Sequence, residues 1–260
     1  MAIASDGPLG LRQGSGPTGQ GYRAARMIGD MCITDATFDV MRRLLCKRAG
    51  AGLQTCIFFA NAHFVVQCQN LKDKMRAPGI IVLPDGIAID TASRILYGRT
   101  FRENLNGTDF IPRLLNSMPR NTAVYLLGAK PASVTAAANA LREIPTVNVA
   151  GTTDGYSMWK DEAATIGAIN AASPDILLVA LGNPLQEQWI LDNRAKLDVP
   201  LIFAVGALFD FLSGHQVRAP GWMRSLRCEW LYRMLRDPQR LAGRYSIGIA
   251  RFARVVARSR

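Results

Sequence analysis

Short apolar runs alternate with amphipathic segments of ten to fourteen residues from about Asp35 onward. Apolar runs too short for a helix predict strands that are covered on both faces. The expected strands span residues 53–59, 79–83, 122–127, 146–150, 176–181 and 201–205. The expected helices span residues 37–48, 62–74, 87–96, 109–118, 132–143, 161–171 and 185–196. This order predicts an α/β fold with a doubly wound, mostly parallel, Rossmann-like sheet.

The composition divides the chain into three segments. Residues 1–30 contain seven glycines and two prolines without a sustained hydrophobic period. Such a segment buries too little apolar surface to offset its ordering entropy, so it is expected to be mostly disordered. Residues 31–214 form the predicted α/β domain. Residues 215–260 form a helical appendage, in which tryptophan, leucine and methionine recur every four residues along one predicted helix face.

Positive charge is concentrated in this appendage. The chain has a formal net charge of +11, and residues 216–260 carry eleven arginines and two acidic residues. Basic amphipathic helices with interfacial tryptophans are typical of segments that lie on an anionic membrane surface, and arginine suits phosphate and pyrophosphate groups. The alternative is a helical hairpin packed on the sheet with its charged face in water. Binding to nucleic acid is not expected, because no recognisable DNA- or RNA-reading module accompanies the charges.

The sequence lacks the usual cofactor and metal motifs at the positions where they would be functional. No GxGxxG follows the first predicted strand, since this string occurs only at residues 14–19 of the glycine-rich N-terminal segment, and GxxxxGK[ST] is absent, which argues against dinucleotide-dependent enzymes and P-loop nucleoside triphosphatases. There is no Asp-x-Asp pair and no His pair at ligand spacing, so chemistry without a metal or other cofactor is expected. The five cysteines form no CxxC pair and are expected to be buried thiols in the cytoplasm. The longest apolar run, residues 201–209, is half of the roughly 20 residues that span a bilayer, so membrane contact is expected to be peripheral.

Asp85 is the candidate catalytic carboxylate. Ligands bind at the carboxyl ends of the strands in sheets of this kind, so the loops after the strands are the expected site. Asp85 follows a predicted buried strand and precedes a predicted helix, where it could remove a proton from a reacting hydroxyl as a general base. Pro-Asp-Gly is also a favoured turn tripeptide, so a purely structural role is the alternative.

Other polar residues in or beside these loops are candidates for substrate binding: Asn61, His63, Asn106, Thr108, Asp109, Gln186 and Glu187. Each has a structural alternative. Asn61 and the segment from Asn106 to Asp109 could cap helices, with Thr108 at the expected N-cap position. Gln186 and Glu187 could complement the dipole of a helix that begins there.

Seven motifs, taken in order, resemble the bacterial glycosyltransferases of the WecG/TagA/CpsF family: PDGIAID, NGTDF, VYLLGAKP, GTTDGY, LGNPLQEQWI, AVGALFDFLSGHQVRAPGW and EWLYRMLRDPQRLAGRY. The resemblance extends from about residue 30 to the end of the chain. Within the family, the sequence is similar to exopolysaccharide (xanthan- and acetan-type) β-1,4-glucosyltransferases.

The resemblance implies inverting, metal-independent transfer of a hexose, expected to be glucose, from a UDP-sugar to a monosaccharide on a polyprenyl diphosphate. The reaction would occur in exopolysaccharide repeat-unit assembly, on the cytoplasmic face of an anionic membrane. Family members can associate, so a homo-oligomer is compatible with the resemblance. The alternatives are an N-acetylmannosaminyl- or other hexosyltransferase of the same family, and a non-catalytic protein that binds nucleotide sugars at the membrane surface.

The resemblance also implies roles for particular residues. The catalytic aspartate of the family corresponds to Asp85, and its Gln-Glu pair to Gln186 and Glu187. Its arginine-rich appendage, which would contact the lipid diphosphate or leaving group, corresponds to Arg218, Arg233, Arg240 and Arg244. Two positions depart from the family pattern. Phe59 replaces a common Thr or Ser, and Asn104 replaces a common Arg, which removes a hydroxyl and a positive charge from the expected site.

Overall fold

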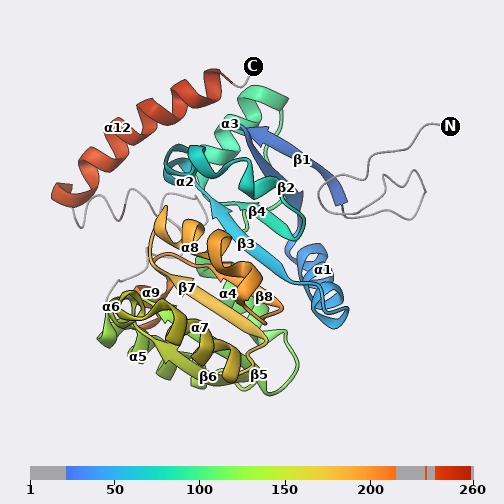
Figure 1. Cartoon of the computed structure of the whole chain (residues 1–260). Helices are drawn as coiled ribbons and strands as arrows, with labels where there is room; N and C mark the ends of the chain where they lie inside the picture. Colours follow the sequence, from blue (N-terminus) through green and yellow to red (C-terminus); the bar gives the residue numbers. More distant parts are fainter. Residues whose placement is uncertain (1–21, 215–231, 233–237, 259–260) are drawn as a thin grey trace.

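The computed structural model describes residues 22–214, 232 and 238–258, which fold around a six-stranded sheet (Figure 1). The strands are β3 (Thr55–Ala60), β4 (Ile80–Pro84), β5 (Thr122–Gly128), β6 (Val147–Thr153), β7 (Ile176–Ala180) and β8 (Leu201–Ala204). Their order is β4-β3-β8-β7-β5-β6, and every neighbouring pair is parallel. The predicted doubly wound α/β fold is therefore confirmed, and the six predicted strands match within about two residues at most ends.

The helices that accompany the sheet are α1 (Phe38–Gly50), α2 (Ala62–Gln67), α3 (Ile87–Tyr97), α4 (Gly107–Asn116), α5 (Pro131–Arg142), α6 (Gly155–Lys160), α7 (Glu162–Ala171), α8 (Leu185–Asn193), α9 (Leu208–Leu212) and α12 (Pro238–Ala257). The predicted helix over residues 62–74 ends early and continues as two 3₁₀ turns. One reason is local. The Gln69 side chain donates to the carbonyl of Val65, the acceptor that a continuing α-helix would offer to the Gln69 backbone.

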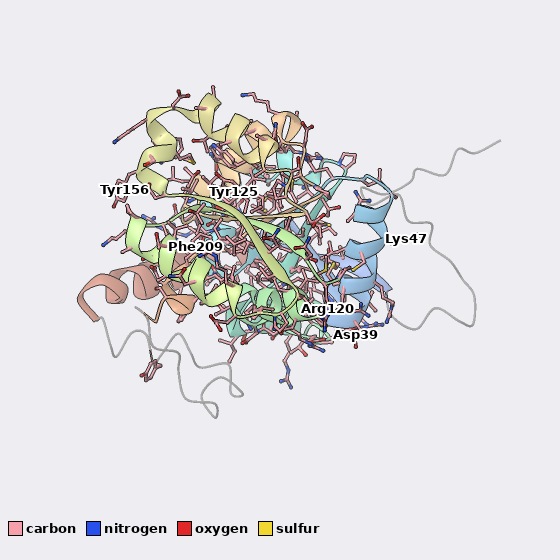
Figure 2. The ribbon with its side chains drawn as sticks, turned by 90° about the horizontal axis from the view of Figure 1, so that it is seen from below. Asp39, Lys47, Arg120, Tyr125, Tyr156 and Phe209 are labelled. Atoms are coloured by element: carbon pink, nitrogen blue, oxygen red, sulfur yellow. The ribbon has the colours of Figure 1, made fainter. Side chains whose placement is uncertain are left out.

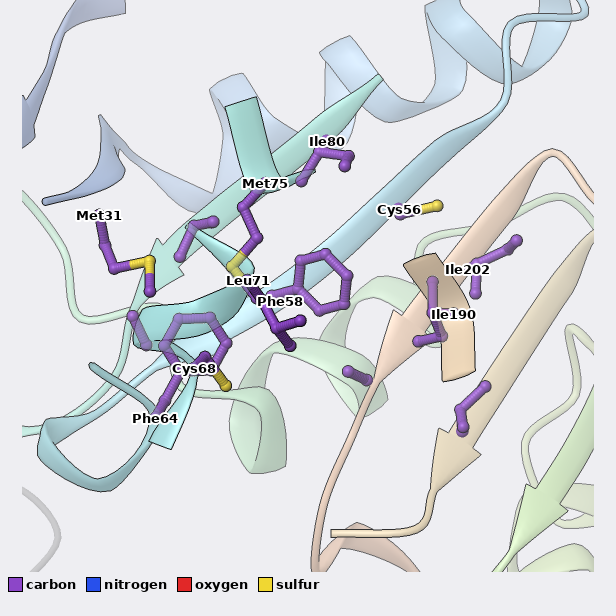
Figure 3. Close-up of a cluster of buried hydrophobic side chains, with 14 of the residues drawn as sticks. Met31, Cys56, Phe58, Phe64, Cys68, Leu71, Met75, Ile80, Ile190 and Ile202 are labelled. Atoms are coloured by element: carbon purple, nitrogen blue, oxygen red, sulfur yellow. The ribbon is translucent and has the colours of Figure 1, made fainter. Parts of the chain in front are cut away.

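Alternate residues of each central strand face opposite sides of the sheet. In β3, Phe58 belongs to one buried cluster, with residues of α2, α3, α6, α7, α8 and α12, and Phe59 belongs to the other, with residues of α1, α4, α5 and α9. Figure 3 shows Phe58 and Phe64 within the first cluster, with Cys68 beside Phe64. Because both faces are covered by helices, only the edges and the strand ends of the sheet remain for binding.

An antiparallel hairpin precedes the sheet and corrects the expectation for residues 1–30. Strands β1 (Tyr22–Ile28) and β2 (Met31–Ala36) pair with Ile28 opposite Met31, and both residues of the intervening loop have positive φ. Gly-Asp suits such a two-residue turn. Ile28 and Met31 are buried in the same cluster as Phe58. Residues 22–30 are therefore ordered, because their apolar side chains pack on the sheet domain. Their apolar pattern is short and follows a glycine-rich segment, which is why the sequence did not predict a strand there.

Helix α12 lies beside α2 (Figure 1). Its C-terminal part is anchored by Phe252 and Val256, which are buried in the same cluster as Phe64. The described part of the appendage thus packs on the fold. The predicted stripe of Trp222, Leu226, Trp230 and Met234 lies outside the described residues, so the hairpin alternative stays a prediction. Arg218 and Arg233 lie outside the described residues, and Arg240 and Arg244 belong to the part of α12 whose side chains are not described. Among the described residues, no helix has both the length and the apolar character to cross a bilayer.

Candidate active site

A cavity of about 1110 Å³ follows the carboxyl edge of the sheet. The loops after all six parallel strands contribute to its wall, and Gly248 and Ile249 of α12 line it as well. The predicted fold class places ligands at this edge of the sheet. Of the eight predicted site residues in the α/β domain, seven line the cavity: Asn61, His63, Asp85, Asn106, Thr108, Asp109 and Gln186. The eighth, Glu187, is buried behind the wall with 1% of its surface exposed.

Asp85 is half-buried at the end of β4 and is positioned by hydrogen bonds with residues at the end of the neighbouring strand β3. Its backbone N–H donates to the Ala60 carbonyl (2.9 Å), which continues the pairing of β3 with β4. The Asn61 side chain donates from Nδ2 to Asp85 Oδ2 over 3.4 Å, and its Oδ1 accepts from the Phe64 N–H, which caps α2. Asn61 therefore combines the capping role with a contact to the candidate base. A donated hydrogen bond stabilises the charged form of a carboxylate, the form that can accept a proton.

The turn after Asp85 is held by one of the two residues that depart from the family pattern. Gly86 has φ +90°, a conformation that favours glycine, and its N–H donates to Asn104 Oδ1 (3.1 Å). Asn104 thus supplies an acceptor beside the candidate base instead of a cation. Phe59, the other departure, presents an aromatic wall to the cavity in place of a hydroxyl. Its ring packs so closely on Gly107 that a Cβ there would lie 2.9 Å from it.

The N-terminus of α4 is capped by Asn106 rather than by Thr108. Asn106 Oδ1 accepts from the Asp109 N–H (3.0 Å), and its Nδ2 donates to Asp109 Oδ2 (2.9 Å), a reciprocal arrangement like a capping box. The expected N-cap at Thr108 is therefore wrong, because the helix begins two residues earlier than expected, at Gly107. All three polar residues still line the cavity, so their predicted contacts with substrate stay predictions.

Gln186 joins the loops that follow β7 and β8. Its Oε1 accepts from the N–H groups of Gly182 and Gly206, both at 3.1 Å, and its Nε2 donates to Glu187 Oε1 (2.8 Å). Asn183 Nδ2 donates to the same Glu187 oxygen over 2.5 Å. Burial raises the pKa of Glu187 to about 7, against the opposing effect of these donors. Because Gln186 lines the cavity with its oxygen already bonded, any contact with substrate would use its remaining N–H.

Three cavity residues near the other end of the sheet were not predicted. Lys130 follows β5, and Tyr156 and Trp159 belong to α6, after β6. Tyr156 is 62% exposed and Trp159 54% exposed, which is unusual for large aromatic side chains. Figure 2 shows Tyr156 at the outer edge of the molecule, whereas Tyr125 and Phe209 lie inside. The signal in the sequence that could have identified these residues was their position shortly after a predicted strand.

Comparisons with known proteins identify the family of the chain. The model of the "Glycosyl transferase WecG/TagA/CpsF family" matches residues 26–260. A curated relative from Bacillus subtilis (strain 168), named N-acetylglucosaminyldiphosphoundecaprenol N-acetyl-beta-D-mannosaminyltransferase, is 34% identical over 161 residues. The match covers 61% of this chain and 62% of the relative, which is less than two thirds of its length. The relative's name specifies N-acetylmannosamine, so the similarity to glucosyltransferases gains no support from it. The chain belongs to the WecG/TagA/CpsF family of glycosyltransferases.

Proposed function

We propose that this protein transfers a hexose from a UDP-sugar to a monosaccharide carried on a polyprenyl diphosphate. Membership of the family supports the class of reaction. The observation that carries the proposal is the position of Asp85, half-buried in the cavity wall at the carboxyl edge of the sheet and hydrogen-bonded by Asn61. A carboxylate in such a place can act as a general base toward a hydroxyl bound in the cavity.

The proposed reaction inverts the anomeric centre and uses no metal. The acceptor hydroxyl oxygen forms a bond to the anomeric carbon while Asp85 takes the hydroxyl proton. The bond from that carbon to the diphosphate breaks, and its electron pair leaves with UDP. Arginines of the C-terminal segment, with Arg218, Arg233, Arg240 and Arg244 as the candidates, balance the charge that develops on the diphosphate. This segment also faces the lipid diphosphate and the anionic inner surface of the membrane, where the protein binds peripherally.

The strand order supports one orientation of the donor. Asp85 follows β4 at one edge of the sheet, and Tyr156 follows β6 at the other edge. Neighbouring strands lie about 4.8 Å apart, so these edges are separated by roughly 24 Å, enough for an extended nucleotide sugar. The hexose then lies near Asp85, and uracil lies toward the later strands. Tyr156 and Trp159 offer exposed ring faces to the base at that end.

Two donor sugars remain as candidates, each with its own support. UDP-glucose, used in assembly of an exopolysaccharide repeat unit, is favoured by the sequence motifs that resemble xanthan- and acetan-type enzymes. UDP-N-acetylmannosamine is favoured by the name of the Bacillus subtilis relative. We propose glucose as the donor, with the N-acetylated sugar as the second candidate.

A donor panel tests the proposed function. Purified protein is incubated with polyprenyl-diphosphate-linked glucose and one of UDP-glucose, UDP-N-acetylmannosamine or UDP-N-acetylglucosamine, with and without EDTA, and the lipid-linked product is analysed by mass spectrometry. We expect a disaccharide product from UDP-glucose that EDTA does not diminish. Product from UDP-N-acetylmannosamine alone would select the second candidate. Binding of UDP without any product would favour a non-catalytic binding protein, and activity restored by Mg²⁺ after EDTA would contradict the metal-free reaction.

A further inference from the structure

A buried carboxyl lies directly behind the cavity wall. Glu187 belongs to the first turn of α8 and is 1% exposed, so it does not reach the cavity itself. Two side chains that do line the cavity, Gln186 and Asn183, both donate to its Oε1. Within the described part of the chain, its Oε2 accepts no hydrogen bond from a nitrogen or oxygen donor, and the Cys68 thiol interacts with the carboxyl. Burial of a carboxyl is costly unless hydrogen bonds offset it, and the two donors at Oε1 supply this compensation on one side only.

Glu187 determines which way the Gln186 carboxamide points. A carboxamide has a donor end and an acceptor end of nearly the same shape, so its hydrogen-bond partners decide its orientation. Glu187 Oε1 accepts a hydrogen bond from Gln186 Nε2, so Gln186 Oε1 faces the N–H groups of Gly182 and Gly206. If the Gln186 carboxamide were reversed, its oxygen would face the Glu187 oxygen, and its N–H groups would face the N–H groups of Gly182 and Gly206. The carboxyl therefore selects the one orientation in which all these groups are paired.

The two glycines that Gln186 joins hold the middle of the cavity floor. Gly182 follows β7 and Gly206 follows β8, which are neighbouring strands, and both glycines have positive φ. Asn183 and Ala207, the next residues of these loops, also line the cavity. Without the bridging amide, two adjacent loops at the centre of the sheet edge would lose their common hydrogen-bond acceptor. Their backbone N–H groups would then need other partners.

We propose that Glu187 is a positioning residue: through Gln186 and Asn183 it holds the loops after β7 and β8 in the shape that binds the nucleoside diphosphate of the donor. This inference rests on the proposed function for its ligand. It requires an acceptor oxygen at the position of Oε1 and does not require a negative charge. A glutamine at this position therefore replaces the carboxyl, whereas a side chain of similar length without an acceptor does not.

Three substitutions separate these requirements. Glu187→Gln keeps the acceptor and removes the charge. Glu187→Asp keeps the charge but withdraws the acceptor by one methylene group. Glu187→Met keeps the length and removes the acceptor. Each full-length variant is first checked for a cooperative thermal unfolding transition, and then the Kd for UDP is measured by calorimetry. Exchange of the Gly182 and Gly206 amide hydrogens is followed by NMR as a readout that needs no ligand.

We expect Glu187→Gln to bind UDP within about threefold of the wild type, and Glu187→Asp and Glu187→Met to bind about tenfold more weakly or worse. The Gly182 and Gly206 amides should exchange faster in the last two variants only. UDP binding and exchange that are unchanged in Glu187→Asp and Glu187→Met would overturn the proposal, as would a Glu187→Gln protein as impaired as Glu187→Met. If Glu187→Met does not fold, Glu187→Asp decides. Failure of the wild type to bind UDP would instead contradict the proposed function, and the exchange data would still test the positioning role.

Discussion

At the scale of single residues, Glu187 makes the stability of the fold depend on pH. Its pKa is about 7 in the folded protein, against an ordinary value of 4.5, because burial disfavours the charged form. The folded state therefore binds this proton more tightly than the unfolded state does. The free energy of unfolding should fall as pH rises from 4.5 to about 7, by on the order of 3 kcal/mol from this group, and should not change through it at higher pH.

The Glu187→Gln variant isolates this contribution, since glutamine does not titrate. The unfolding free energies of the wild type and Glu187→Gln are measured by urea denaturation between pH 4.5 and 8. We expect the value for the wild type to fall relative to that for Glu187→Gln as pH rises, and the difference to level off near pH 7. A difference that is constant across this range, or one that moves in favour of the wild type, would show that Glu187 is not buried as a raised-pKa carboxyl.

Individual residues of the site differed in how far the sequence could define them. Asp85 and Asn61 could be placed together because each follows a strand, and parallel strands end at one edge. The cap of α4 was predicted at Thr108 instead of Asn106, since both residue types cap helices and only the backbone decides between them. The bridging role of Gln186 could not be foreseen, because its partners Gly182 and Gly206 are brought together only by the pairing of β7 with β8.

At the scale of elements, the apolar periodicity was enough to locate the parallel strands and most helices, because these strands are buried on both faces. It was not enough for the β1–β2 hairpin, whose short apolar pattern follows a glycine-rich segment. It also could not decide how the C-terminal helix is placed. A stripe of apolar residues predicts that a helix buries one face, but the same stripe serves a membrane surface or a protein surface, and here Phe252 and Val256 pack beside α2.

Replacement of Phe252 tests the docking of α12. Phe252→Ala removes a side chain that is 6% exposed and should loosen the helix, at a cost of about 3 kcal/mol if the whole contact is lost. Hydrogen–deuterium exchange of residues 248–258 should rise, while that of β7 should not. Arg251→Ala, at an exposed position of the same helix, is the matched control. Equal exchange in both variants and the wild type would mean that Phe252 does not anchor α12.

At the scale of the whole molecule, helix α12 both carries exposed positive charge and lines the cavity. Arg251, Arg254 and Arg258 are exposed on α12, and the same helix lines the cavity through Gly248 and Ile249. In the proposed function, a lipid-linked acceptor would meet these charges and the reacting groups together. The sequence located this charge, but the contact of α12 with the cavity required the three-dimensional arrangement.

Neutralising these three arginines tests the proposed peripheral membrane contact. Arg251→Gln, Arg254→Gln and Arg258→Gln combined should weaken binding to anionic phosphatidylserine vesicles by about 100-fold, since each arginine near such a surface contributes roughly 1 kcal/mol. Binding should also decline with added salt. The control removes three exposed charges elsewhere, at Arg43, Lys47 and Arg120. Equal losses in sedimentation with vesicles for the two triple variants would indicate a non-specific charge effect and contradict a membrane-facing α12.

Sugar transfer by this fold depends, in the proposed mechanism, on the carboxylate at the end of β4. The most direct measurement is the kcat of Asp85→Asn with UDP-glucose and polyprenyl-diphosphate-linked glucose, beside Asp39→Asn, which alters an exposed aspartate of α1 outside the cavity. Loss of a general base lowers rates by about 10²–10⁴-fold, so Asp85→Asn should lose transfer to this extent while its Kd for UDP stays near that of the wild type. Asp39→Asn should behave as the wild type. An Asp85→Asn protein that retains a substantial part of the wild-type kcat would contradict the assignment of Asp85 as the base.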